Sequence, residues 1–214
     1  NYIQLAILVG LCALCRSLPL YLSESQTFDM SFIVVLATAL YYDPFWAIAV
    51  YCISIFFVFE RAEEGEVHHI FSKPPIKFLF NQSNVAISVF LAGFTLTLTH
   101  SCGDGFSVPL SIFTAILFTL LEIVINMILL LILLSFGFGY SMLKLRNLIG
   151  VFPNVVAMPP LGLLFAFILR MDYGFYLLFL FMLPLLLARY SFKLYLDNVT
   201  QYYNMTKALT AAIE

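Results

Sequence analysis

Long apolar runs, separated by glycine, proline and charged residues, dominate the chain. A run of about 20 apolar residues is long enough for a helix to cross the hydrocarbon core of a bilayer. We predict helices over residues 2–20, 30–42, 45–59, 77–100, 108–136, 151–170 and 173–190. The pattern therefore predicts an all-α integral membrane protein, a polytopic bundle of about seven transmembrane helices with a range of six to eight.

The second and third runs fit either two short helices or one longer helix with a kink. Met30–Tyr42 has 13 residues, or about 20 Å of helix, against a hydrocarbon core of about 30 Å. Asp43 and Pro44 follow, and a proline at this place ends or kinks a helix. Two short helices that meet at this turn, or one long helix kinked at Pro44, both satisfy the pattern. The choice decides which side of the membrane the N-terminus faces.

The composition supports a membrane location. Hydrophobic residues make up 63% of the 214 residues and charged residues 10%, whereas a soluble domain has about 45–50% and about 25%. This difference excludes an ordinary cytosolic globule, so the lipid bilayer is the expected partner. The formal net charge of −2 offers no basic surface for nucleic acid.

Basic residues suggest an orientation. If seven segments alternate and the C-terminus is cytoplasmic, the only basic residue on the outer side is Arg170. The inner side then receives Arg16, Arg61, Lys73, Lys77, Lys144, Arg146, Arg189, Lys193 and Lys207. This bias follows the positive-inside rule, and the kinked alternative moves only Arg16 outward.

The character of the chain changes at residue 191. Tyr195, Val199, Tyr202, Thr206, Leu209 and Ile213 follow one another at spacings of 4, 3, 4, 3 and 4. This is a heptad seam, and it indicates either a parallel two-stranded coiled coil in a homodimer or a frayed amphipathic tail. We divide the chain into a transmembrane domain, 1–190, and a cytosolic signalling helix, 191–214, which we expect to lead into a further cytosolic domain.

Two polar stripes lie inside the predicted spans. Glu122 is at the middle of the run 108–136, where a charge costs at least about 2.5 kcal/mol, so it should face the bundle interior, pair or carry a proton. The stripes could line a small-molecule pocket in which Glu122 recognises an amine or a hydroxyl. The alternative is interhelical hydrogen bonding alone. The candidate ligand-binding residues are Glu122, Asn126, Asn81, Asn84, Ser88 and Thr95, and Ser111, Thr114, Thr119 and Thr99 extend the stripes.

Other candidate chemistry has plainer interpretations. Cys12 and Cys15 have redox-pair spacing but lie in an apolar run, where packing is the expected role. His68 and His69 lie near three glutamates without the fixed spacing of a metal site. Pro159 and Pro160 are expected to interrupt the sixth run. Motifs of hydrolases, zinc proteases and phosphate-binding loops are absent from the sequence, so we expect no enzyme activity, cofactor or metal in this chain.

Three stretches together carry a family resemblance. They are Ser31–Leu40 leading to Asp43-Pro44, Lys77–Asn81, and Tyr202–Glu214 with its Lys-Ala-Leu-Thr-Ala-Ala-Ile-Glu ending. They resemble the N-terminal membrane-associated sensor (MASE-type) domains of bacterial HD-GYP proteins. The resemblance implies a sensory input domain in the bacterial inner membrane, with a small-molecule ligand or the membrane state as its input. The attached HD-GYP enzyme would hydrolyse cyclic di-GMP, and its catalytic motifs would lie beyond Glu214.

A second resemblance covers the first 60 residues. The apolar stretch with its turn at Asp43-Pro44 is similar to the substrate-binding subunits of energy-coupling-factor importers, which usually have Gly-Pro at this turn. It implies an alternative function as the substrate-binding subunit of a vitamin-type importer. A third possibility is a scaffold that anchors an enzyme to the membrane and binds nothing.

Overall fold

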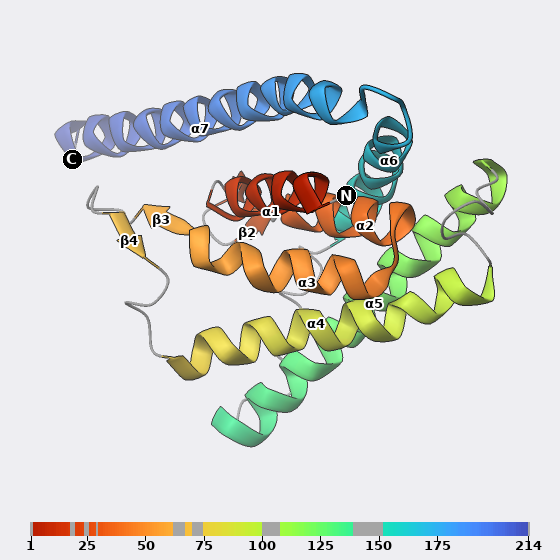
Figure 1. Ribbon diagram of the computed structural model, residues 1–214. Coiled ribbons are helices and arrows are strands. Elements are labelled where there is room, and N and C mark those ends of the chain that lie inside the picture. The colour runs from red at the N-terminus through yellow and green to blue at the C-terminus, as the bar shows by residue number, and fades with distance from the viewer. Residues whose placement is uncertain are drawn as a thin grey trace.

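The computed structural model describes residues 2–17, 20–23, 26–28, 30–61, 67–69, 75–99, 108–138 and 152–213. These residues form a helical bundle (Figure 1). Its helices are α1 (Tyr2–Ser17), α2 (Ser31–Tyr41), α3 (Pro44–Ser54), α4 (Pro75–Leu98), α5 (Val108–Phe138), α6 (Phe152–Leu169) and α7 (Gly174–Ile213). The prediction of a helical protein is confirmed, and each predicted run corresponds to one helix.

Short non-helical elements lie between some of the helices. A 3-10 turn, Ile55–Phe57, extends α3. Two antiparallel hairpins, which the sequence analysis did not predict, pair β1 (Leu20–Ser23) with β2 (Gln26–Phe28) and β3 (Phe59–Arg61) with β4 (Val67–His69). Strands of three or four residues are too short for an alternating pattern to stand out in a hydrophobic chain.

Residues 30–59 form two short helices rather than one kinked helix. α2 ends at Tyr41, Asp43 is extended, and α3 starts at Pro44 and packs back along α2. The Asp43 carboxylate accepts a hydrogen bond from the backbone N–H of Trp46 at 3.0 Å, so Asp43 is the N-cap of α3. Proline suits the next position because its missing N–H needs no partner there.

Helix α2 is the centre of the bundle. Every residue from Ser31 to Leu40 is buried, and α2 packs against α1, α3, α5 and α6. Its 11 residues measure only about 16 Å, about half a bilayer core. A helix this short could be accommodated within a membrane domain, because other helices of the protein surround it.

Hydrogen bonds identify the two ends of the bundle. At one end, which we call the Arg16 end, Arg16 near the end of α1 bonds to Tyr51 near the end of α3 and to Gln82 near the start of α4. At the other, the Arg170 end, Arg170 bonds to the carbonyl oxygen of Leu40 in the last turn of α2.

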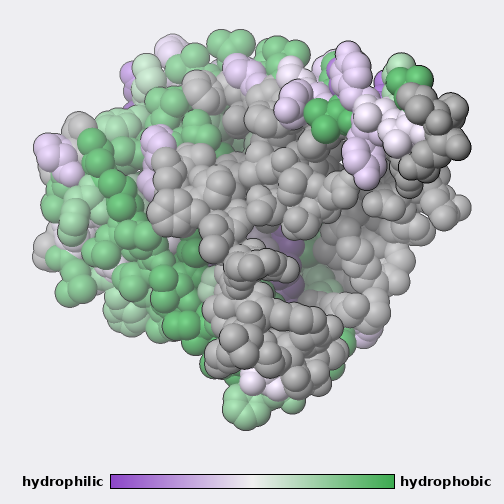
Figure 2. Space-filling view, turned by 180° about the vertical axis from the view of Figure 1, so that it is seen from behind, coloured by the Kyte–Doolittle hydropathy of each residue, from purple (hydrophilic) through white to green (hydrophobic). Residues whose placement is uncertain are grey.

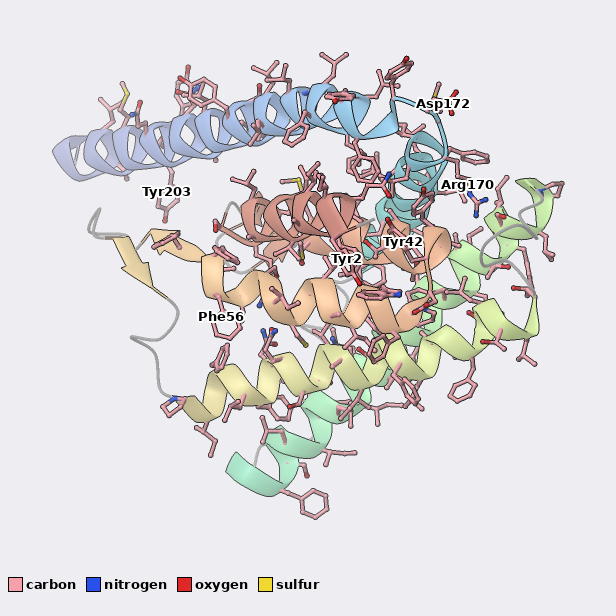
Figure 3. The ribbon with its side chains drawn as sticks, viewed as in Figure 1. Tyr2, Tyr42, Phe56, Arg170, Asp172 and Tyr203 are labelled. Atoms are coloured by element: carbon pink, nitrogen blue, oxygen red, sulfur yellow. The ribbon has the colours of Figure 1, made fainter. Side chains whose placement is uncertain are left out.

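Figure 3 shows Tyr42 and Arg170 at this second end, while Phe56 and Tyr203 lie toward the first. α1 and α3 therefore end, and α4 begins, at the Arg16 end, whereas α2 and α6 end at the Arg170 end. The side of a membrane that each end would face stays a prediction.

Apolar side chains cover one side of the face that Figure 2 shows. Among the described residues, two helical segments, Phe78–Leu98 and Pro109–Leu133, are long and apolar enough to cross a membrane. They expose large hydrophobic groups that include Phe90, Phe94, Phe113, Ile116, Val124 and Ile128. An apolar surface of this kind is compatible with contact with lipid. The larger number of spans predicted from the sequence stays a prediction.

The last two helices continue through positions at which the sequence predicted a break or a change of character. Pro159 and Pro160 were expected to interrupt the sixth run, but α6 continues through both. α7 is a single helix of 40 residues, about 60 Å long. It passes through the predicted boundary at residues 190 and 191 without a break.

Close packing of α6 against α2 depends on Gly162. A Cβ at this position would lie 2.5 Å from Cδ2 and 3.0 Å from Cβ of Leu36, which is itself fully buried. We expect Gly162→Ala to lower the free energy of unfolding by about 1–3 kcal/mol, because the crowded core must shift to admit the methyl group. The measurement is denaturant unfolding in detergent. In the Leu36→Ala background the same substitution should cost less, and an equal cost in both backgrounds would contradict this contact.

Candidate functional site

The predicted polar stripes of α4 and α5 face each other. Glu122, on α5, is only 5% exposed. Its Oε1 accepts hydrogen bonds from Ser88 Oγ on α4, at 3.2 Å, and from Asn126 Nδ2 one turn along α5, at 3.3 Å. The spacing of four residues between Glu122 and Asn126 places both on one face of the helix. We call Glu122, Asn126, Asn84 and Ser88 the polar centre.

Asn84 contributes donors to this cluster. Its Nδ2 donates to the side-chain Oδ1 of Asn126 at 3.1 Å and lies 3.3 Å from the backbone oxygen of the same residue. Asn84 is 4% exposed, and its Oδ1 is buried without a hydrogen-bond partner. Buried polar atoms in this state are rare, because each forgoes the hydrogen bond that it would make in water.

Hydroxyl groups continue the polar contact toward the Arg170 end. Thr114 Oγ1 on α5 lies 3.0 Å from Oγ1 of Thr99, the residue that follows α4. Thr95 and Thr119 are buried between these positions and the polar centre, and each bonds to a carbonyl oxygen of its own helix. Ser111 is fully buried, and its Oγ has no hydrogen-bond partner. We call this set of hydroxyls the hydroxyl seam.

The six residues predicted as ligand contacts therefore separate into three groups. Glu122, Asn126, Asn84 and Ser88 form one hydrogen-bonded cluster. Thr95 shares the interface but bonds to Ala92 of its own helix. Asn81 lies near the start of α4, and its side chain is exposed. A position on the polar face of α4 is therefore not sufficient to place a side chain in the interface with α5.

The residues predicted for the signalling helix all lie in α7. Four of them are exposed, namely Tyr195 at 63%, Val199 at 46%, Tyr202 at 72% and Leu209 at 62%. The side chain of Ile213 lies outside the described set. The seam is therefore not covered by the rest of this chain at the four positions.

A second polar cluster was missed by the sequence analysis. Arg16 Nη1 donates to the carbonyl oxygen of Tyr51 at 3.0 Å and to Ser54 Oγ at 3.2 Å, and Nη2 donates to Gln82 Oε1 at 2.9 Å. The guanidinium also lies over the ring of Tyr51, 4.2 Å from its centroid. We call these four residues the Arg16 clamp. The sequence could have indicated this cluster, because Arg16, Ser54 and Gln82 are polar residues in largely apolar runs and polar residues in such runs need hydrogen-bond partners.

Other candidate groups lie apart from the polar centre. Cys12 and Cys15 are buried in the main hydrophobic core. His68 and His69 belong to β4, and the glutamates near them in the sequence lie outside the described residues. In the part of the chain that the structure describes, no group of three or more His, Cys, Asp or Glu residues could hold a metal ion.

Comparisons with known proteins add no family assignment. No protein-family model matches the chain, and no curated protein or solved structure is significantly similar to it. The features of this chain that point to a function are the polar centre, the Arg16 clamp and the long helix α7.

Proposed function

We propose that this chain is a membrane-embedded sensory input domain that regulates an attached cytosolic HD-GYP phosphodiesterase through α7. The observation that carries the proposal is the continuity of α7, which runs from its contact with α6 to Ile213 as one helix of 40 residues. A continuous helix transmits a rotation or translation of its first turns to its last. In this proposal the domain lies in the bacterial inner membrane and its C-terminus is cytoplasmic, as the basic residues and the family resemblance suggest.

A series of helix–helix contacts connects the polar centre to α7, which supports the proposed transmission of a signal from the polar centre. The polar centre lies between α4 and α5, α5 packs against α6, and α6 packs against α7. A change in the separation of α4 and α5 would therefore shift α6, and with it the start of α7. Packed helices tend to move between discrete arrangements, because their interdigitated side chains resist continuous sliding.

The exposed seam of α7 supports the output side. Tyr195, Val199, Tyr202 and Leu209 are exposed in one copy of the chain, and their heptad spacing suits a parallel partner helix. A homodimer through this seam would bring two attached enzymes together. A small rotation of each α7 would then change how the two enzymes face each other.

Insertions in α7 test the proposal. Two alanines placed between Tyr190 and Tyr195 would turn the distal part of the helix by about 200°. Seven alanines would restore the heptad register. We expect the rate of cyclic di-GMP hydrolysis by the full-length protein in membranes to change several-fold with two alanines and to return to the wild-type rate with seven. A rate that is the same for all three proteins would support an anchor rather than a sensor.

The same measurement tests the importer alternative. A vitamin-binding subunit would have no attached phosphodiesterase, so no cyclic di-GMP hydrolysis would accompany this chain. We favour the sensor, because Glu122 accepts hydrogen bonds from Ser88 and Asn126 of the chain itself, and because substrate capture would not need a continuous helix of 40 residues.

A further inference from the structure

The apolar helices of the bundle have two different lengths. α1 has 16 residues, α3 has 11 and the 3-10 turn that extends α3 has 3. They measure about 24 Å for α1 and about 22 Å for α3 with its turn, against a hydrocarbon core of about 30 Å. The apolar segments Phe78–Leu98 of α4 and Pro109–Leu133 of α5 have 21 and 25 residues, or about 31 Å and about 37 Å. One flat bilayer cannot match both groups, and a tilt of the short helices would only reduce the height that they span.

The short helices expose an apolar surface. α1 and α3 pack against each other (Figure 1), and each has an exposed apolar stripe. Its large members, which we call the short face, are Ile3, Leu14, Phe45, Trp46, Ile53 and Phe57. Charged residues limit this face along the chain, namely Arg16 near the end of α1, Asp43 before α3 and Glu60 after the 3-10 turn. An apolar surface with charges at both ends suits lipid acyl chains between two headgroup layers. α3 also packs against α4, which is long enough to cross a membrane.

The difference in length is concentrated at the Arg170 end. At the other end, the Arg16 clamp joins α1, α3 and α4. Gly93 of α4 lies against Pro44, the first residue of α3, because a Cβ at Gly93 would be 2.5 Å from Pro44 Cγ. α4 continues through residues 94–98, about 7 Å beyond this contact. The apolar surface of the bundle therefore has a step at the Arg170 end, lower at α3 and higher at α4.

This step meets the elements that lead into α7. Asp43 lies at the turn between α2 and α3, and in a bilayer as thick as α4 it would lie below the headgroups. A carboxylate at that depth is costly, so a thicker bilayer favours an outward movement of this turn. Leu40, in the last turn of α2, accepts a hydrogen bond from Arg170 Nη2 at 3.3 Å. Because Arg170 lies between α6 and α7, and α6 packs along α2, a movement of the turn would shift the start of α7.

We propose that the thickness of the hydrocarbon core is the input of the sensor, and that the bilayer thins beside the short face. Lipids with short acyl chains gather there, because the cost of a mismatch rises with every ångström. The identity of the input rests on the proposed sensor function, whereas the thinning rests only on the membrane location.

The fluorescence of Trp46 tests the thinning in the wild-type protein. Trp46 is the one tryptophan of the chain, and it is exposed on the short face. The protein is placed in vesicles that contain equal amounts of two phosphatidylcholines, with acyl chains of about 14 and about 22 carbons, which form thin and thick bilayers. Bromine on the chains of one lipid quenches a tryptophan that it touches. We expect Trp46 to prefer the short lipid by about twofold or more, as measured by exchanging which lipid carries the bromine.

A tryptophan on α5 provides the matched control. Phe113 is exposed on α5, beside the longer apolar segment, and Phe113→Trp in a Trp46→Phe background moves the probe there. This tryptophan should prefer the long lipid or neither. Equal quenching of Trp46 by the two lipids, or the same preference for the short lipid at both tryptophans, would overturn the thinning. An absence of quenching by either lipid would mean that protein covers α3, and would also overturn it.

Cyclic di-GMP hydrolysis by the full-length protein tests the input. In vesicles of a single phosphatidylcholine, we expect the rate to change several-fold as the acyl chains lengthen from about 14 to about 22 carbons. If Trp46 prefers the short lipid and the rate ignores chain length, while the alanine insertions in α7 do change the rate, the thinning stands and thickness is overturned as the input. A rate that also ignores the alanine insertions would overturn the sensor function itself.

Discussion

Replacing Gly174 by alanine is expected to lower the free energy of unfolding by about 3 kcal/mol or more, at the upper end of the effects of overpacking. A Cβ at this position would overlap the carbonyl oxygen of Ile168, a backbone atom that cannot turn aside as a side chain can. Two hydrogen bonds hold the connection in place, from Met171 N to Ile168 O at 3.1 Å and from Gly174 N to Met171 O at 2.9 Å. The turn between α6 and α7 would have to open to admit the methyl group.

The measurement is denaturant unfolding of the purified protein in detergent, with Gly10→Ala as the matched control. Gly10 lies in α1, and a Cβ there would have nothing within 4 Å. The control should therefore be neutral or stabilising by up to about 1 kcal/mol, because alanine favours a helix more than glycine does. Equal stability of Gly174→Ala and the wild type would contradict the described path from α6 into α7.

Removing the guanidinium of Arg16 is expected to cost about 2–4 kcal/mol. Arg16→Met keeps most of the apolar stem but leaves Gln82 Oε1 without its charged donor. Hydrogen bonds to charged groups contribute about 1.5–3 kcal/mol each, and the contact with the Tyr51 ring adds about 0.5–1 kcal/mol. The partners of Arg16 in the clamp belong to α3 and α4, so the loss should loosen three helices at the Arg16 end.

Arg16→Lys and a double-mutant cycle make this prediction specific. Lysine keeps the charge but has a single nitrogen, which cannot reach the positions of both Nη1 and Nη2, so part of the loss should remain. Arg16→Met combined with Gln82→Leu should cost less than the sum of the single changes by about 1–3 kcal/mol. Strict additivity of the two changes would show that the guanidinium does not act through Gln82.

Much of the candidate site was predictable from two local constraints, namely the cost of a charge in an apolar run and the helical repeat. Glu122 lies at the middle of an apolar run, and a charge that faced lipid there would be costly, so the run predicts that Glu122 turns inward. Asn126 shares its face through the helical repeat, and Asn84 and Ser88 follow from the same repeat on the neighbouring helix. Asn81 fits that repeat equally well, yet its side chain is exposed near the start of α4. The repeat identifies the face of a helix, and the burial of each position on that face depends on the path of the neighbouring helices.

The sequence by itself determined where the helices lie, that the chain after residue 190 is helical, and that polar positions of α4 and α5 turn inward. These properties depend on the helical repeat and on the cost that a polar group would have on an apolar outer surface. Only the tertiary structure decided that residues 30–59 form two short helices, that α2 is enclosed on all sides, and that Arg16 meets Gln82, 66 residues away. Such contacts depend on which helices become neighbours, and the periodicity of one segment does not specify its neighbours.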